Sequence, residues 1–394
     1  MDPWRGQRGF DKALRKYLER AVAWGAVGGG LFLTAAAYSV YILPVVSFLL
    51  QLDSLPDAWG EAEAEAMRRL LPGPGSWCVP GDLHALRAAG CPKEFPDAER
   101  VSLASRLRVA HQEALPRGLA VAQRARRLRR WLADTEHVVR KGTWAHWFQK
   151  SFVLQLEGAV DHFARAGVTP ADIETQLASG EMRPFRPCTA LRVRRGFQRA
   201  AYAAIDQTSE ARLEVRARHK LERWGVPQFP RIRAQRGIQV LRRLGQLLPP
   251  RAWSAVWRTL WNGWVTHRRW PDRPGSLNRC VFCGPRAADS IEHYATCPCI
   301  WAFARSRLGL ARPATTAECL SCFLILDVPP RSAETAAELL ARKALRTAAA
   351  YRVHCMVRHG RVLPGEAARE ALQQSVRELV RGHTGANRPP GYYC

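Results

Sequence analysis

A short array of cysteine and histidine residues constrains the fold of this chain more than any other feature. Two residues separate Cys280 from Cys283, nine separate Cys283 from His293, and three separate His293 from Cys297, which gives a Cys-x2-Cys-x9-His-x3-Cys pattern. Two thiolates on a tight turn, and an imidazole one helical turn from a third thiolate, can occupy the corners of a tetrahedron around Zn2+. Because four protein ligands leave no position for water or substrate, the pattern predicts one structural zinc ion.

Alternatives remain open for the cysteines of this region. Cys299 could replace Cys297 as the fourth ligand, or the residues could be reduced core cysteines beside a chance histidine. Zinc-dependent base deaminases use similar residues, but their signature places His-x-Glu before the Cys-x-x-Cys pair, the reverse of the order here. Cys319 and Cys322 have no second pair of ligands beside them, which favours ordinary buried cysteines over a second zinc site.

The net charge of the chain predicts a polyanionic partner. The formal charge is +26, and arginine supplies nearly all of the basic residues. A basic excess of this size attracts nucleic acid, with an anionic membrane surface as the competing partner. The planar guanidinium group binds phosphates and stacks on bases, which favours RNA or DNA.

Candidate phosphate contacts gather in a basic block between residues 192 and 243 and again near residue 268. For any single arginine, a solvated position on a helix surface is the alternative interpretation, since phosphate contacts use only part of a basic face. The candidates are Arg192, Arg194, Arg195, Arg199, Arg216, Arg218, Lys220, Arg231, Arg233, Arg268 and Arg269.

Cysteine usage indicates a reducing compartment. The chain has eleven cysteines, an odd number, and several of them cluster with a histidine, which favours metal ligation over a disulfide framework. Acidic residues at Asp2, Asp11 and Glu19 fit poorly with a cleaved targeting segment. We therefore expect an intracellular protein, in the nucleus or the cytoplasm.

Hydrophobic residues recur at helical spacing over most of the chain. Trp253, Trp257 and Trp264 form a stripe that is more typical of a core than of a stacking platform for unpaired bases. The same spacing predicts helices over residues 121–132, over 333–355 and from about residue 364 to Gly382. We expect an all-α fold, in which multi-helix bundle regions enclose a small CCHC zinc knuckle inserted between helices.

The stretch Ala21–Leu52 contains no charged residue and is long enough to span a membrane. Gly28, Gly29, Gly30 and Pro44 interrupt it, so two buried helices that meet at these breaks are the alternative. A single-span membrane protein with a basic, zinc-binding cytosolic domain is therefore the second interpretation of the whole chain.

Motifs for common catalytic chemistries are absent. The sequence has no phosphate-binding Gly-x4-Gly-Lys-Ser/Thr loop, no Gly-x-Ser-x-Gly elbow, no His-Glu-x-x-His motif and no Asp-Asp pair. A polymerase needs carboxylates to hold its two metal ions, so we expect no catalysis by this chain alone.

Four segments together resemble the C-terminal part of a non-LTR retrotransposon reverse transcriptase polyprotein, downstream of its polymerase palm. They are Ala37–Leu52, Leu70–Trp77, Trp261–Trp270 and the knuckle with Asp289–Pro298. The first segment is similar to a buried thumb helix of that family, which favours burial over a membrane span. The resemblance implies that the knuckle helps to hold template RNA or target DNA. The palm is missing here, so polymerase activity does not transfer, although a separate chain could supply a palm.

We expect four parts along the chain. Residues 1–72 form a thumb-like helical region, residues 73–250 a basic helical connector, residues 251–303 the Trp-rich helix and zinc knuckle, and residues 304–394 a helical tail. The expected function is non-catalytic binding of nucleic acid, either RNA or DNA. The affinity should fall steeply with salt because binding releases counterions from phosphates.

Overall fold

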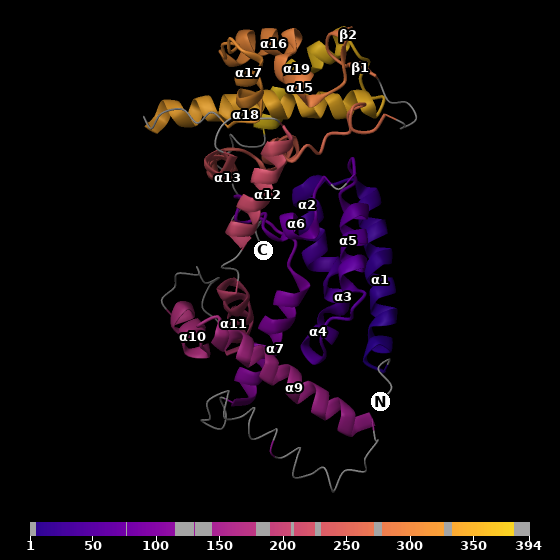
Figure 1. The fold of residues 1–394 in the computed structure, drawn as a ribbon, viewed down its shortest axis with the longest axis vertical. Helices are drawn as coiled ribbons and strands as arrows, with labels where there is room; N and C mark the ends of the chain where they lie inside the picture. The colour runs from indigo at the N-terminus through magenta and orange to yellow at the C-terminus, as the bar shows by residue number, and fades with distance from the viewer. Residues whose placement is uncertain are drawn as a thin grey trace. The chain divides into compact units, whose positions relative to one another are not determined.

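A computed structural model describes residues 5–75, 77–114, 130, 144–178, 190–205, 209–224, 230–271, 278–326 and 333–381. Helices dominate these residues, and the one sheet among them has two short antiparallel strands (Figure 1). The expected all-α class, with a Cys/His cluster between helices, is therefore confirmed. The helix expected over residues 121–132 lies outside the described residues, apart from Arg130.

Contacts group the chain into two compact units, each built from segments that are not consecutive. Unit 1 comprises Met1–Ala23, Ala37–Ala66 and Pro96–Thr208, and unit 2 comprises Trp24–Ala36, Met67–Phe95 and Ser209–Cys394. The expected division into four functional parts stays a prediction.

Unit 1 is organised around the long helix α7 (Ala98–Ala114). Leu107 on this helix belongs to a buried cluster that includes Phe163, Ile173 and Phe197 from three other helices. The elements that lie wholly or partly in this unit are α1 (Arg5–Val27), a π-helix (Tyr38–Ile42), α3 (Pro44–Ser47), α4 (Leu49–Leu52), α5 (Trp59–Leu70), α9 (Trp144–Arg165), α10 (Pro170–Ala178) and α11 (Ala190–Ala204).

The uncharged stretch over residues 21–52 consists of several short helical pieces. Gly28 and Gly30 adopt positive φ angles of 65° and 74° between α1 and α2 (Gly30–Ala37), and Pro44 starts α3. The window Gly30–Ser47 has a mean hydropathy of 1.7, enough to cross a membrane by length and composition, and 44% of it is buried. Core helices of soluble proteins also meet these criteria of length and hydropathy, so the window is weak evidence for a membrane span.

Unit 2 contains the Cys/His array and the remaining elements. They are most of α2, together with α6 (Pro80–His84), α12 (Ser209–Arg223), α13 (Pro230–Leu247), α14 (Pro250–Leu260), β1 (Arg279–Cys280), β2 (Gly284–Ala288), α15 (Ile291–Thr296), α16 (Pro298–Leu308), α17 (Thr316–Phe323), α18 (Ala333–Arg358) and α19 (Glu366–Arg381). The long helix α18 packs against α14, α16 and α19. Figure 1 shows α16 and α19 beside α18. The two helices expected in the tail are α18 and α19, which confirms that prediction.

The tryptophan stripe forms the core beneath the knuckle. Trp253, Trp257, Trp261 and Trp264 have no exposed surface. The rings of Trp257 and Trp261 stack with their centroids 3.7 Å apart, and Trp264 Nε1 donates a hydrogen bond to Thr259 Oγ1 at 2.9 Å. The core interpretation of the stripe is therefore confirmed, because buried rings cannot act as a platform for bases.

Candidate metal centre

Local structure brings the four predicted ligands to one point. Cys280 ends β1, and Cys283 lies in the turn that leads to β2, where Gly284 takes a positive φ of 81°. His293 lies on α15, and Cys297 is the residue between α15 and α16. The chain therefore doubles back between the antiparallel strands β1 and β2 before it enters α15.

Capping fixes the orientation of the helix that carries the histidine. Ser290 precedes α15 in an extended conformation, and its Oγ accepts a hydrogen bond from the His293 backbone N–H at 3.1 Å. Serine is a favoured N-cap because its side-chain oxygen satisfies a free N–H of the first turn. Pro298 then begins α16 directly after Cys297, in the first-turn position where proline is best tolerated.

The four ligand atoms lie within 4.8 Å of one another, so the cluster could hold a metal ion. Cys280 Sγ and Cys297 Sγ are 3.9 Å apart, and Cys283 Sγ is 3.2 Å from His293 Nε2. Zinc bonds of about 2.3 Å to sulfur and about 2.0 Å to nitrogen give tetrahedron edges of about 3.8 Å and about 3.5 Å. The spacing of these side chains therefore fits a tetrahedral ion of this size.

A hydrogen bond joins two of the thiols, Cys280 and Cys297. The hydrogen bond with Cys297, together with burial, raises the pKa of Cys280 far above its ordinary value. The same hydrogen bond lowers the pKa of Cys297 to about 4, against the effect of burial and with help from His293. Burial also raises the pKa of Cys283. A bound cation would stabilise all three thiolates and release their protons, because zinc ligands must be deprotonated.

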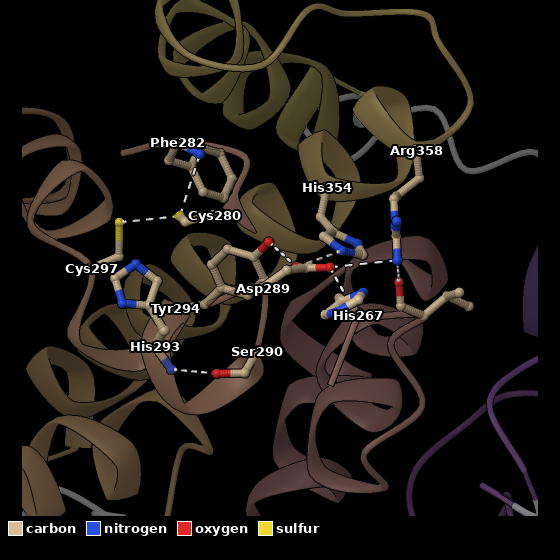
Figure 2. Close-up of polar contacts among 11 residues, drawn as sticks. His267, Cys280, Phe282, Asp289, Ser290, His293, Tyr294, Cys297, His354 and Arg358 are labelled. Carbon is tan, nitrogen blue, oxygen red and sulfur yellow. Dashed lines mark hydrogen bonds and ion pairs between the residues drawn. The ribbon is translucent and has the colours of Figure 1, made fainter. Parts of the chain in front are cut away.

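A second buried centre lies beside the cluster, around the carboxylate of Asp289 (Figure 2). Asp289 has no exposed surface and accepts hydrogen bonds from the Tyr294 hydroxyl and from the His267 backbone N–H, the latter at 2.8 Å. His354 Nε2 and an Arg358 nitrogen each lie 3.4 Å from its oxygens. One carboxylate thus connects α15, α18 and the segment that precedes the knuckle.

Charge pairing shifts the pKa values within this Asp289 centre. Burial raises the pKa of the Asp289 carboxyl, but the hydrogen bond and charge of His354 outweigh it, and the pKa is lowered overall. Burial lowers the pKa of His354, yet its interactions with Asp289 and Cys355 outweigh that effect and the pKa is raised. Both shifts favour the charged pair.

The start of α19 closes the other side of the knuckle. The backbone N–H of Gly365 donates to the carbonyl of Val281 at 2.9 Å, and Arg369 donates to the carbonyl of Phe282 at 3.1 Å. The Phe282 ring is buried against Tyr294, with ring centroids 5.6 Å apart. The segment between Cys280 and Cys283 is therefore held by polar contacts from the start of α19 and by an apolar contact with Tyr294 on α15.

The other cysteines take different positions. Cys299 is half-buried on α16, and it is not part of the ligand group. Cys319 and Cys322 are buried on α17, and Cys322 Sγ accepts a hydrogen bond from Arg346 at 3.3 Å. Among the described residues, the single group of three or more possible ligands is the one formed by Cys280, Cys283, His293 and Cys297.

Some predicted phosphate contacts have partners inside unit 2. Arg216 makes two hydrogen bonds, at 3.0 and 3.2 Å, to the buried carboxylate of Asp82. Lys220 is buried and donates to the carbonyl of Trp77 at 2.7 Å, and burial lowers its pKa to about 8. Arg269 is half-buried and donates to the carbonyl of Pro74. Their positions in the sequence carried no sign of these partners.

Other candidates are exposed. Arg199 on α11, Arg218 on α12 and Arg268 are exposed; Arg218 lies 3.8 Å from Glu222, and Arg268 pairs with Glu292. The side chains of the remaining candidates lie outside the described part of the structure, although their backbones belong to α11 or α13. These are Arg192, Arg194, Arg195, Arg231 and Arg233. Contact of any of them with nucleic acid stays a prediction.

Comparison of the chain with protein-family models, with curated proteins and with solved structures found no match. The assignment to a family therefore rests on the four sequence segments alone, and it enters below only as a proposal.

Proposed function

We propose that this chain is a non-catalytic nucleic-acid-binding protein, related to the C-terminal part of a non-LTR retrotransposon reverse transcriptase, with one structural zinc ion in its knuckle. The observation that carries the proposal is the convergence of three thiols and one imidazole within 4.8 Å. Thiolates and imidazoles are the ligands of structural zinc sites, and four of them complete a tetrahedron without an open position. The ion would hold the fold and would not activate water.

The basic surface supports nucleic acid as the partner. The chain carries a net charge of +26, and exposed arginines lie on the segments of unit 2 that precede and follow the knuckle in the sequence. These include Arg268, Arg279, Arg305, Arg307 and Arg312. Phosphates attract such a surface regardless of base sequence, so binding would be mainly electrostatic and open to both RNA and DNA.

Metal analysis tests the zinc assignment. Purified wild-type protein should contain one zinc ion per chain, and Cys280→Ser and His293→Ala should each lose the ion together with cooperative melting. Wild-type material that folds without stoichiometric metal would contradict a structural zinc site.

A salt series tests the partner. Filter binding of RNA and DNA from low to high salt should show an affinity that falls steeply, because each neutralised phosphate releases counterions. A flat response would contradict electrostatic binding. A transcript that encodes an in-frame palm upstream, or a co-purifying palm-bearing chain, would instead identify this polypeptide as part of a polymerase.

One observation favours a membrane protein as the second candidate. The window Gly30–Ser47 is apolar enough to cross a bilayer, and Val40 and Phe48 within or next to it are 56% and 66% exposed. Carbonate extraction separates the candidates, since a spanning protein stays in the membrane pellet and a peripheral one is released.

A further inference from the structure

Trp270 differs from the tryptophans of the core. The three rings of the stripe and the neighbouring Trp261 are fully buried, whereas Trp270 is 42% exposed. It follows directly after two arginines, of which Arg268 is exposed. An indole that keeps this much surface in water beside cationic side chains has the composition of a stacking site for bases.

Trp270 lines a groove of about 860 Å3 within unit 2, which we call the Trp270 groove. The wall formed by residues 28–30 is glycine backbone, and a Cβ atom at Gly28 or Gly30 would meet nothing within 4 Å. This part of the wall lets a ligand approach the backbone closely. The volume is within the range of pockets that bind small organic molecules.

The charge of the Trp270 groove selects an anionic occupant. Arg251, Arg258 and His359 line it, and no Asp or Glu does so among the described residues. Arg258 lies 4.5 Å from the Trp77 ring centroid and contacts the carbonyl of Pro72, and Arg251 donates to the Glu378 carbonyl. Each guanidinium carries five N–H donors, so these contacts leave donors for phosphate oxygens.

We propose that the Trp270 groove binds an unpaired nucleotide of a single-stranded RNA or DNA. Its base would stack on the indole, and the flanking phosphates would contact Arg251 and Arg258. Bases inside a duplex are already stacked on each other, so they cannot reach the indole. The inference rests on the proposed function and deepens it, because it names single-stranded nucleic acid as the ligand class.

Fluorescence anisotropy with three labelled ligands tests the proposal: a single strand, its duplex, and the same strand with abasic sites that keep the phosphates. Wild-type protein should prefer the intact single strand. Trp270→Ala should weaken binding to that strand by about fivefold to a hundredfold, the effect of losing one stacked base, and should leave the abasic strand unchanged. Trp270→Phe should keep most of the affinity.

Two further variants are controls. Leu363→Ala removes another exposed apolar side chain, 75% exposed, and should change nothing. Arg268→Ala should weaken binding to the intact strand, the abasic strand and the duplex alike, because it removes a positive charge and no stacking surface. Melting curves of all variants should match wild type, since these side chains are exposed.

The outcomes separate this inference from the proposed function. If Trp270→Ala binds the intact strand like wild type while Arg268→Ala binds it more weakly, the groove is not a base site and electrostatic binding stands. If wild-type protein binds none of the three ligands at low salt, the proposed function itself fails. If Trp270→Ala instead loses binding to anionic lipid vesicles alone, the groove belongs to a membrane surface and the inference is overturned.

Discussion

The metal centre and the Asp289 centre lie side by side, but they balance their charges differently (Figure 2). In the Asp289 centre, one carboxylate faces His354 and Arg358 and accepts further hydrogen bonds, so the chain supplies both signs of charge. In the metal centre, three thiols converge beside a single imidazole. The chain itself supplies the cationic partners of the first centre, whereas the second needs a bound cation before all its thiols can ionise. Stability around α15 should therefore depend on an ion on one side only.

Loss of a metal ligand should have the largest effect. His293→Ala leaves three thiols without the fourth ligand, and we expect loss of zinc and unfolding of the segment from β1 to α16. Structural zinc contributes about 10 to 16 kcal/mol of apparent binding free energy in small zinc domains, so the loss of stability here should be at least several kcal/mol. Zinc content and thermal unfolding measure both effects.

A chelator should reproduce the ligand variant in wild-type protein and have no further effect on the variant. Cys78→Ser is a matched control, since Cys78 is another partly buried thiol but lies outside the ligand group. A His293→Ala protein that keeps one zinc ion per chain would contradict the claim that the four-ligand group holds a structural ion.

Removing the charge of Asp289 should have the next largest effect. Asp289→Asn leaves His354 and Arg358 without their buried anion, and removal of one partner from a buried ion pair costs about 3 to 5 kcal/mol. We expect chemical denaturation to show this loss while zinc content stays at the wild-type level, because Asp289 is not a ligand.

Glu292→Gln is the control for Asp289→Asn. Glu292 is a carboxylate three positions along the chain that pairs with exposed Arg268, and such surface pairs contribute about 0 to 1 kcal/mol. If both variants lose the same free energy of unfolding, burial does not make the Asp289 carboxylate more important for stability than the Glu292 carboxylate. Loss of zinc from Asp289→Asn would mean that zinc binding depends on the Asp289 centre, so the two centres would not be independent.

The charged pair of His354 and Asp289 should make the stability of unit 2 depend on pH. Burial lowers the pKa of His354, but Asp289 and Cys355 raise it more, so the folded value exceeds the unfolded value of about 6.5. The contribution is therefore fully present below pH 6.5 and is lost as the pH rises through the folded pKa. It amounts to about 1.4 kcal/mol for each tenfold difference in proton affinity between the folded and unfolded states. Denaturation of wild type and His354→Gln across this range should give a difference that shrinks as the pH increases. If the difference in unfolding free energy between wild type and His354→Gln does not change with pH, His354 and Asp289 do not form a charged pair that stabilises unit 2.

The same contrast explains what the sequence could and could not predict. The four ligands lie within one short segment, so their spacing alone predicted that they converge. Asp289 and Arg358 are far apart in the sequence, and no local pattern marks a carboxylate whose partners lie on another helix. Likewise, helical periodicity predicted the buried tryptophan stripe, but it could not show that Lys220 is buried against the Trp77 carbonyl while Arg218 remains exposed. Periodicity assigns a residue to a face of a helix, and only the packing of distant segments decides what covers that face.

Cys299 gives the smallest expected effect and the sharpest test of how the metal centre is assembled. The sequence left Cys297 and Cys299 open as the fourth ligand, and the structure groups Cys297 with the other three. Cys299 follows Pro298 in the first turn of α16 and is half-buried, and its thiol interacts with that of Cys297 from outside the ligand group. We therefore expect Cys299→Ser to keep one zinc ion and wild-type melting within about 0.5 kcal/mol, as for most surface substitutions. Cys297→Ser should lose the ion. A Cys297→Ser protein that keeps zinc, together with a Cys297→Ser/Cys299→Ser protein that loses it, would instead show that Cys299 replaces the missing ligand. Loss of zinc from Cys299→Ser alone would reverse the assignment, since it would mean that Cys299 is a ligand.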